Sequence, residues 1–278
     1  MIGPFSFYSP PSRYARVSDV RIHYRVLGAG EPLVMLHGLG SAGSDWFPVT
    51  PGLAPYYRLV LVDLRGHGQS SLARDYSIAA MARDVKAVLD AEGIGQTHVL
   101  GLSLGGCVAL QLAIAAPARV MGLVLVNTFA RLRHEGMWRR RLARVRYAAL
   151  GSMDDLARLV AGSLFGDPAA QALAFDRLRR NDLGAIRRCM MAVARFDVRR
   201  QLSQITAPTL VLIGDRDRTV PRRCADELAA GIPHARLQVI ADAGHALPHE
   251  QPEAFTRAVL AFLAATSETR QATVEPAG

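Results

Sequence analysis

Short apolar runs alternate with segments of helical periodicity along most of the chain. Seven runs have the length and composition of β-strands. They are Val20–Val26, Pro32–His37, Leu59–Asp63, Thr97–Leu102, Val120–Val126, Pro208–Gly214 and Arg236–Ala241. Several are almost unbroken, such as LVLV at 59–62 and again at 123–126. Such runs are typical of strands buried on both faces of a mostly parallel sheet.

The segments between these runs have the periodicity of amphipathic helices. In Ser77–Glu92 the apolar positions share one helical face, and Gly93 follows as a stop signal. These apolar positions are Ile78, Met81, Val85, Val88 and Leu89. Because strand–helix–strand repeats form right-handed crossovers, the pattern predicts an α/β fold with a doubly wound, mostly parallel sheet.

The alternation stops between about Thr128 and Gln204, where no strand-like run occurs. The segment is helical in pattern and too long for a connecting loop, so we expect a helical cap inserted into the sheet domain. The predicted division is residues 1–128 for the first part of the core and 129–204 for the cap. Residues 205–268 form the second part of the core, and 269–278, small and polar, a flexible tail.

The basic residues are concentrated in the predicted cap. The whole chain carries a net charge of +9, and residues 129–204 hold 16 Arg and no Lys against six Asp and one Glu, also +9. One interpretation is a solvated surface. The other is an electropositive mouth that attracts an anion, with Arg140 and Arg144 on one helical face. The anion would be a carboxylate-bearing ester or lactone, an acidic acyl-carrier protein or an anionic lipid surface.

Composition excludes several other classes of protein. Half of the 278 residues are hydrophobic, which rules out a disordered chain, and 6% aromatic residues without a nucleic-acid-binding motif argue against nucleic acid. Cys107, Cys189 and Cys224 are odd in number and dispersed, which indicates a reducing, cytoplasmic compartment and no disulfide scaffold. The uncharged stretch Val99–Ala116 contains four residues typical of turns, so it predicts a strand, a turn and a helix rather than a transmembrane segment.

The sequence GLSLG at 101–105 fits the G-x-S-x-G pattern of a nucleophile elbow, with Ser103 at its centre. A buried strand leads into it and a buried helix follows, as an elbow requires. The alternative is an ordinary glycine-rich turn, including a phosphate-binding loop, but no G-K-[ST] or G-x-G-x-x-G motif is present.

A serine nucleophile requires a base and an orienting acid. His245 follows the last predicted strand, where α/β sheets place functional loops, and is favoured over His249, which lies near the next helix. Asp215 and Asp217 both follow the strand 208–214, and either gives the chain order Ser, Asp, His that this architecture uses.

The remaining parts of such a site are backbone donors and a substrate pocket. HGLG at 37–40 ends another strand, so the amides of Leu39 and Leu104 are predicted to form the oxyanion hole. DLRGHGQS at 63–70 is interpreted as a tight turn that braces the site. Five apolar side chains line the predicted pocket or, equally, pack in the core. They are Trp46, Phe129, Met137, Trp138 and Phe196.

Taken together, these motifs resemble the α/β-hydrolase fold family over nearly the whole chain. The matching pieces are HGLG at 37–40, DLRGHGQS at 63–70, GLSLGG at 101–106, GDRDRTVP at 214–221 and GHALPHEQPEAF at 244–255. The resemblance implies an eight-stranded sheet, one strand more than the seven runs. It also implies Ser103 as nucleophile, His245 as base and Asp217 as acid. A serine in place of an aspartate nucleophile speaks against the dehalogenase and epoxide-hydrolase branches.

The stretch LVLVNTFAR at 123–131 is similar to the 3-oxoadipate enol-lactonase group of esterases and lactonases. We therefore expect a serine hydrolase that cleaves a carboxylic ester or lactone through an acyl-enzyme, without metal or other cofactor. Two alternatives stay open. One is a thioesterase or acyl-carrier-protein methyl esterase that docks an acidic partner on the basic cap, and the other is a ligand receptor on a hydrolase scaffold.

Overall fold

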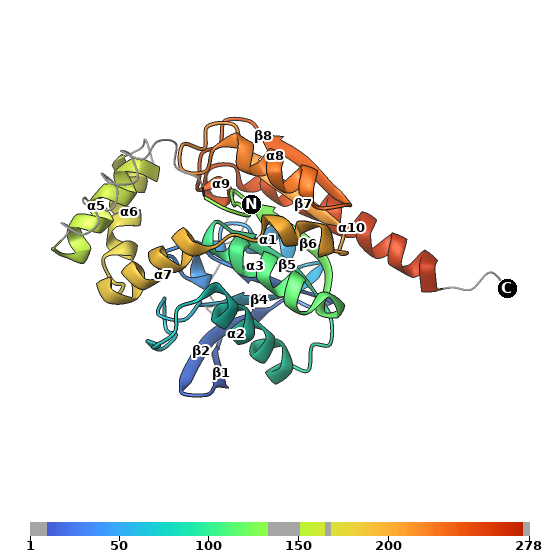
Figure 1. Cartoon of the computed structure of the whole chain (residues 1–278), viewed down its shortest axis with the longest axis horizontal. Helices are drawn as coiled ribbons and strands as arrows, with labels where there is room; N and C mark the ends of the chain where they lie inside the picture. The colour runs from blue at the N-terminus through green and yellow to red at the C-terminus, as the bar shows by residue number, and fades with distance from the viewer. Residues whose placement is uncertain (1–9, 133–150, 165–167, 275–278) are drawn as a thin grey trace, which may run out of the picture.

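The computed structural model describes residues 10–132, 151–164 and 168–274. Its centre is one eight-stranded sheet with the strand order β1-β2-β4-β3-β5-β6-β7-β8 (Figure 1). The strands are β1 (Ser12–Val17), β2 (Val20–Leu27), β3 (Glu31–Leu36), β4 (Tyr57–Val62), β5 (Thr97–Leu102), β6 (Val120–Val126), β7 (Thr209–Gly214) and β8 (Ala235–Ile240). The predicted α/β class and eight-stranded, mostly parallel sheet are confirmed.

From β3 onward, helices connect successive strands. The α-helices are α1 (Thr50–Leu53), α2 (Ile78–Ala91), α3 (Leu104–Ala115), α5 (Met153–Leu164), α6 (Pro168–Leu178), α7 (Leu183–Arg195), α8 (Arg222–Gly231), α9 (Leu247–Glu250) and α10 (Pro252–Val274). Short 3-10 helices occur at η1 (Gly43–Trp46), η2 (Pro117–Arg119) and η3 (Arg199–Gln204). The predicted buried face of α2 is correct, with its N-terminus capped by the Ser77 side chain.

Strands β3 to β8 run parallel to one another, whereas β2 pairs antiparallel with both β1 and β4. Strand β1 has no counterpart among the predicted runs. Its sequence, SRYARV, is mostly exposed and contains two arginines, because an edge strand buries little of its surface. A pattern search for buried strands therefore passes over it.

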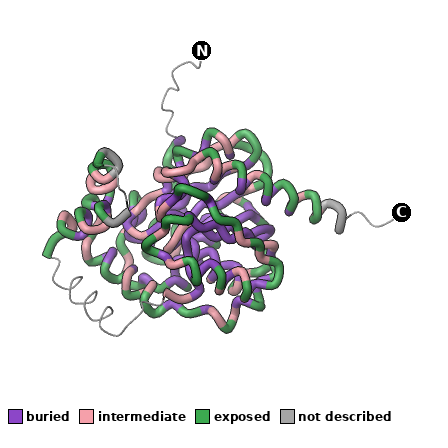
Figure 2. Tube along the Cα trace, turned by 90° about the horizontal axis from the view of Figure 1, so that it is seen from above, coloured by how far each residue is buried: buried purple, intermediate pink, exposed green. Residues whose placement is uncertain are grey.

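Side chains of each central strand alternate between two cores, one on each face of the sheet. In β3, Val34 and Leu36 face the core under α2, α3 and α8, while Leu33 and Met35 face the core under α1 and α10. Both faces of the strand are thus buried, which is why the sequence shows unbroken apolar runs. Figure 2 shows this buried interior surrounded by exposed helix faces.

The segment between β6 and β7 contains α5, α6, α7 and η3, and its described residues include no strand. In Figure 1, α5 and α6 lie at one end of the molecule, and α7 leads from them back to the sheet. Helices α5 and α6 enclose a small core of their own, made of Ala157, Ala161 and Leu178. The division into core and cap remains a prediction.

Helix α10 runs to Val274, so the tail predicted to begin at residue 269 starts as helix. The small polar residues that suggested a tail are accommodated by the helix itself. Thr266 and Thr269 donate their hydroxyl hydrogens to the carbonyl oxygens four residues earlier, at 2.9 Å each. Within the described residues, none of the helices combines the length and apolarity that crossing a membrane demands.

Candidate active site

Ser103 lies in a strained turn between β5 and α3. Its backbone angles, φ 53° and ψ −112°, are outside the regions that residues with a side chain normally adopt. Neighbouring bonds hold this conformation: the Ser103 amide donates to the Val126 carbonyl at 3.0 Å, and Thr128 Oγ1 donates to the Ser103 carbonyl at 2.7 Å. A Cβ on Gly105 would overlap the Leu36 carbonyl oxygen, so only glycine permits α3 to begin this close to β3. These are the features of a nucleophile elbow.

His245 and Asp217 meet although they are on separate loops. His245 Nδ1 lies 2.8 Å from Asp217 Oδ2, and their side chains are 12% and 0% exposed. The other carboxylate oxygen, Oδ1, accepts the amides of Thr219 and Val220 at 2.7 and 3.0 Å. Because both oxygens have donors, the Asp217 carboxylate is fixed in position and can orient the imidazole.

The rival residues have other partners. Asp215 Oδ1 accepts the Ala243 amide at 3.2 Å and so ties the loop after β7 to the loop after β8. The ring of His249, in α9, bonds to the backbone of Asp45, and burial lowers the pKa of His249. Of the two acids and two histidines that the sequence left as alternatives, Asp217 and His245 form the direct side-chain contact.

Asn127, which sequence reasoning missed, links the strand ends that carry this pair. It directly follows β6, is 1% exposed and has a positive φ of 43°. Its Nδ2 donates to the carbonyls of Gly244 and His245 at 2.9 and 3.0 Å, and its Oδ1 accepts the Gly214 amide at 3.0 Å. A polar residue at the end of a buried apolar strand was the available signal.

Glu250 was also missed. Its Oε2 accepts the Gly244 amide at 2.6 Å, and its Oε1 accepts the Ala246 amide at 3.1 Å. These two amides flank His245 in the chain, so one carboxylate fixes the backbone on both sides of the histidine.

The HGLG segment lies against the elbow. A Cβ built on Gly38 would be 3.7 Å from the Ser103 Cβ. His37 accepts the Leu64 amide on Nε2 at 3.0 Å, which assigns its proton to Nδ1, and Nδ1 donates to the Gly38 carbonyl at 2.7 Å. Burial holds the pKa of His37 below 6.5, so the ring is neutral. The Gly38 carbonyl and the Leu39 amide belong to one peptide group, so this bond also orients the Leu39 N–H.

The second predicted oxyanion donor is the Leu104 amide, the first of α3. No acceptor within the described residues is recorded for the amide of Leu39 or Leu104. Unpaired amides at a helix start and in an adjacent loop are suited to binding an anion.

The segment 63–70 forms the tight turn that the sequence predicted. Asp63 accepts bonds from the His23 ring and from the amides of Gly43 and Gln69, at 2.7 to 2.8 Å. Burial alone would raise the pKa of Asp63, but these bonds and the nearby His37 hold it below 3.8. Arg65 pairs with buried Asp84 through two bonds of 2.6 Å.

The predicted pocket residues have mostly core contacts. Trp46 is 1% exposed and stacks on Phe255, with ring centroids 6.2 Å apart, while Phe129 and Phe196 are buried in the other core. Packing accounts for their burial, and no substrate contact is assigned to them. Trp138 and Met137 lie outside the described residues, as do Arg140 and Arg144.

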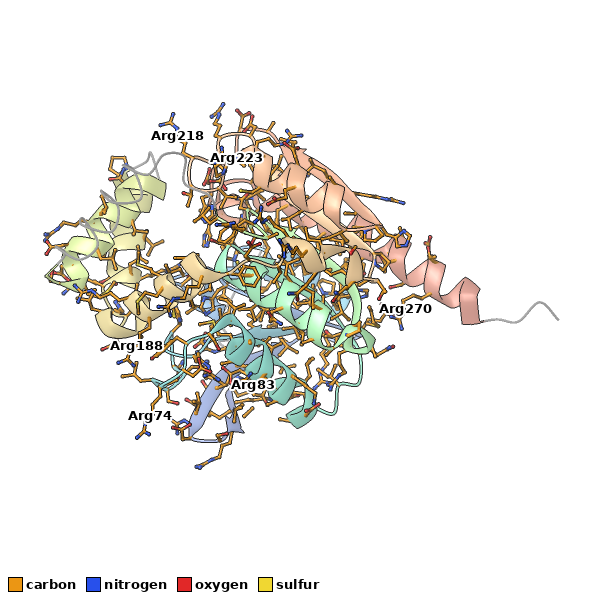
Figure 3. All side chains as sticks on the ribbon, viewed as in Figure 1. Arg74, Arg83, Arg188, Arg218, Arg223 and Arg270 are labelled. Carbon is orange, nitrogen blue, oxygen red and sulfur yellow. The ribbon has the colours of Figure 1, made fainter. Side chains whose placement is uncertain are left out.

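Many described arginines of residues 129–204 are already paired. Each of the following has a carboxylate oxygen within 4.0 Å: Arg131, Arg158, Arg177, Arg179, Arg180 and Arg199. The arginines labelled in Figure 3 project outward from widely separated parts of the fold.

Among the described residues, no cluster of three or more His, Cys, Asp or Glu has the arrangement of a metal site.

The fold and this site define an α/β-hydrolase enzyme. The alpha/beta hydrolase fold profile matches residues 31–252, and the chain belongs to that family. It is 34% identical to a putative carbamate hydrolase of Variovorax paradoxus over 88% of this chain and 97% of the relative.

Solved structures give the same result. A hydrolase from Pseudomonas aeruginosa is 33% identical, with a TM-score of 0.83, over 91% of this chain and 98% of its own. An enol-lactonase from Burkholderia xenovorans is 29% identical, also with a TM-score of 0.83, over 91% of this chain and 100% of its own. The likeness to esterases and lactonases expected from the sequence is thus confirmed.

Proposed function

We propose that this protein is a serine hydrolase that cleaves a carboxylic ester or lactone through an acyl-enzyme. The observation that carries the proposal is the 2.8 Å contact between His245 and the buried side chain of Asp217. Both residues follow the carboxyl ends of parallel strands, as does the strained turn at Ser103. That combination supports nucleophilic catalysis by an activated serine.

In the proposed mechanism, Ser103 Oγ attacks the substrate carbonyl carbon and His245 Nε2 takes the hydroxyl proton. Asp217 holds Nδ1–H and stabilises the imidazolium that forms. The amides of Leu39 and Leu104 bind the oxyanion of the tetrahedral intermediate. His245 then protonates the leaving alkoxide, and the acyl-enzyme forms. Water, deprotonated by His245, hydrolyses that ester and regenerates Ser103.

Carbamate hydrolysis is a second candidate, favoured by the name of the Variovorax relative. A carbamate has a carbonyl group that the same serine could attack. The esterase and lactonase structures favour a free small molecule as substrate over a carrier protein. The cytoplasmic location inferred from three unpaired cysteines stays a prediction.

The test is a panel of p-nitrophenyl esters, lactones and carbamates, varied in acyl length and charge, with wild type and Ser103→Ala. We expect many turnovers on an ester or lactone, loss of nearly all activity in Ser103→Ala, and fluorophosphonate labelling of Ser103 alone. A single burst without turnover would favour the ligand receptor. Full activity of Ser103→Ala would refute the mechanism, and turnover restricted to carbamates would select the second candidate.

The two candidate acids give a sharper test. Asp217→Asn should lower kcat by about 10⁴, because an amide at that position favours the wrong imidazole tautomer. Asp215 contacts the Ala243 backbone amide rather than the histidine, and Asn has the same shape as Asp. Asp215→Asn should therefore lower kcat far less. If Asp215→Asn is the more damaging change, the orienting acid is Asp215.

A further inference from the structure

The C-terminal end of α6 contacts the loop that carries Leu39. Asn181, in the turn between α6 and α7, donates from Nδ2 to the Gly40 carbonyl at 2.8 Å. The Leu178 side chain packs against Gly40 as well, since a Cβ built on Gly40 would be 2.5 Å from Leu178 Cδ2. These residues are some 140 positions from the loop in sequence, so the contact exists only in the folded chain.

A second contact joins α6 to η1, the 3-10 helix that follows the loop carrying Leu39. Arg177, one turn earlier on α6, donates from Nη1 to Asp45 Oδ1 at 2.7 Å. Asp45 also accepts a bond from the Ser41 hydroxyl through Oδ2. The Arg177 side chain is 41% exposed and that of Asp45 22%, so solvent screens this pair. It therefore holds the loop less firmly than the part-buried hydrogen bond from Asn181 to the Gly40 carbonyl.

Between these contacts, Leu39 occupies the centre of a tight turn. The Ser41 amide donates to the Gly38 carbonyl at 3.2 Å and closes the turn around Leu39 and Gly40. The peptide before Leu39 is fixed by His37 at the Gly38 carbonyl. The Gly40 carbonyl, after it, is fixed by Asn181. Without Asn181, the turn would lose its bond at the Gly40 carbonyl and keep the bond from His37 at the Gly38 carbonyl.

We infer that Asn181, supported by Arg177, is a positioning residue that fixes the Leu39 amide for the oxyanion. The inference rests on the proposed function, because it assumes that Leu39 is an oxyanion donor. It adds that the end of α6 sets the geometry of the loop that carries Leu39, so the helical segment between β6 and β7 contributes to the rate.

The test compares Asn181→Leu with wild type on the best ester of the panel. Leucine has a similar size but no donor. Removing an oxyanion donor outright costs about 10²–10³ in kcat, and a donor that is present but misaimed should cost a part of that, about tenfold. We expect kcat and kcat/KM to fall together, with KM within about twofold, as for an interaction made only in the transition state. Affinity for a trifluoromethyl ketone, whose adduct places an oxyanion in the hole, should fall by the same factor. Asn181→Gln, which keeps an amide donor, should recover part of the loss.

Asn181 also donates to the Leu178 carbonyl at 2.9 Å, so its replacement removes a helix cap as well. Arg177→Ala and Arg180→Ala form a matched pair that separates these roles. Both remove one arginine near the C-terminal end of α6, but Arg180, in the turn after the helix, pairs with Asp176 of α6 and has no hydrogen bond to the loop among the described residues. Arg177→Ala should lower kcat by about threefold, and Arg180→Ala should leave it unchanged.

Three results would overturn the inference. The first is an unchanged kcat and ketone affinity in Asn181→Leu, whatever its melting temperature. The second is a rise in KM alone. The third, which applies even if Asn181→Leu does not fold, is equal kinetics for the two arginine variants. A wild type without Ser103-dependent turnover would instead refute the proposed function, and this inference with it.

Discussion

Asn127→Asp tests whether the buried amide at the end of β6 holds the histidine loop in place. The two side chains have the same shape, and both tolerate the positive φ of 43° at this position. The new carboxylate keeps an acceptor for the Gly214 amide but has no donor for the carbonyls of Gly244 and His245. The substitution therefore removes two donated bonds and turns a carboxylate oxygen toward the two carbonyl oxygens, without creating a cavity or backbone strain.

A buried carbonyl left without a donor costs about 1–3 kcal/mol. Because these two contacts are part-buried, the free energy of unfolding should fall by at most about 2–6 kcal/mol. A domain is typically stable by about 5–15 kcal/mol, so the variant should fold but unfold at lower denaturant. One of the freed carbonyls belongs to His245. Displacing a catalytic group by about 1 Å can cost 10² in rate, and we expect kcat to fall by up to that factor.

Urea unfolding followed by fluorescence gives the first quantity, and ester hydrolysis gives the second. The control is Gln96→Glu, the same amide-to-carboxylate change at a surface bond to the Ala118 carbonyl. It should shift stability by no more than about 0.5 kcal/mol and leave kcat unchanged. If Asn127→Asp matches this control in both measurements, the buried amide does not support the site, and the reasoning fails.

Two further predictions concern the turn at 63–70. Asp84→Asn should destabilise the fold by about 3–5 kcal/mol in urea, because it leaves the buried Arg65 guanidinium without its charged partner. Lys86→Ala, which breaks an exposed pair on the same helix, should cost less than about 0.5 kcal/mol, and equal costs would contradict the argument. Burial lowers the pKa of His67 to about 3, so between pH 6.5 and 3 the unfolded chain binds the extra proton and stability falls as pH falls. His67→Asn should flatten that slope by up to about 1.4 kcal/mol per pH unit, and unchanged slopes would show that His67 does not titrate on unfolding.

The central strands could be predicted because their burial shows directly in their own residues. The central parallel strands are covered on both faces, so nearly every side chain in them is apolar, and the predicted bounds of β5 and β6 are the observed ones. The antiparallel edge strand β1 has no such signature, because most of its side chains face solvent. Likewise the polar end of α10 looks like a tail until its hydroxyl groups are seen to bond within the helix.

The candidate site divides in the same way. Ser103 and His245 stand in short motifs whose glycines and strand ends are visible in sequence. The choice between Asp215 and Asp217 depended on a resemblance, since both follow the same strand and only a loop from another strand distinguishes them. Geometry assigns them different partners, an amide for one and the imidazole for the other.

The sequence shows a polar Asn127 at the end of a buried strand, but it does not show the role of that residue, because its partners are far away in the chain. Asn127 bonds to backbone groups 117 and 118 positions later, and nothing in its neighbours indicates which carbonyls it will meet. The arginines illustrate the same limit for charge. A count places the whole excess in residues 129–204, yet Arg177 is paired with Asp45 of η1, which follows the loop that carries Leu39. The net charge of residues 129–204 left open a solvated surface or a mouth that attracts an anion, whereas the contact of Arg177 points to a role in holding the segment that carries Leu39.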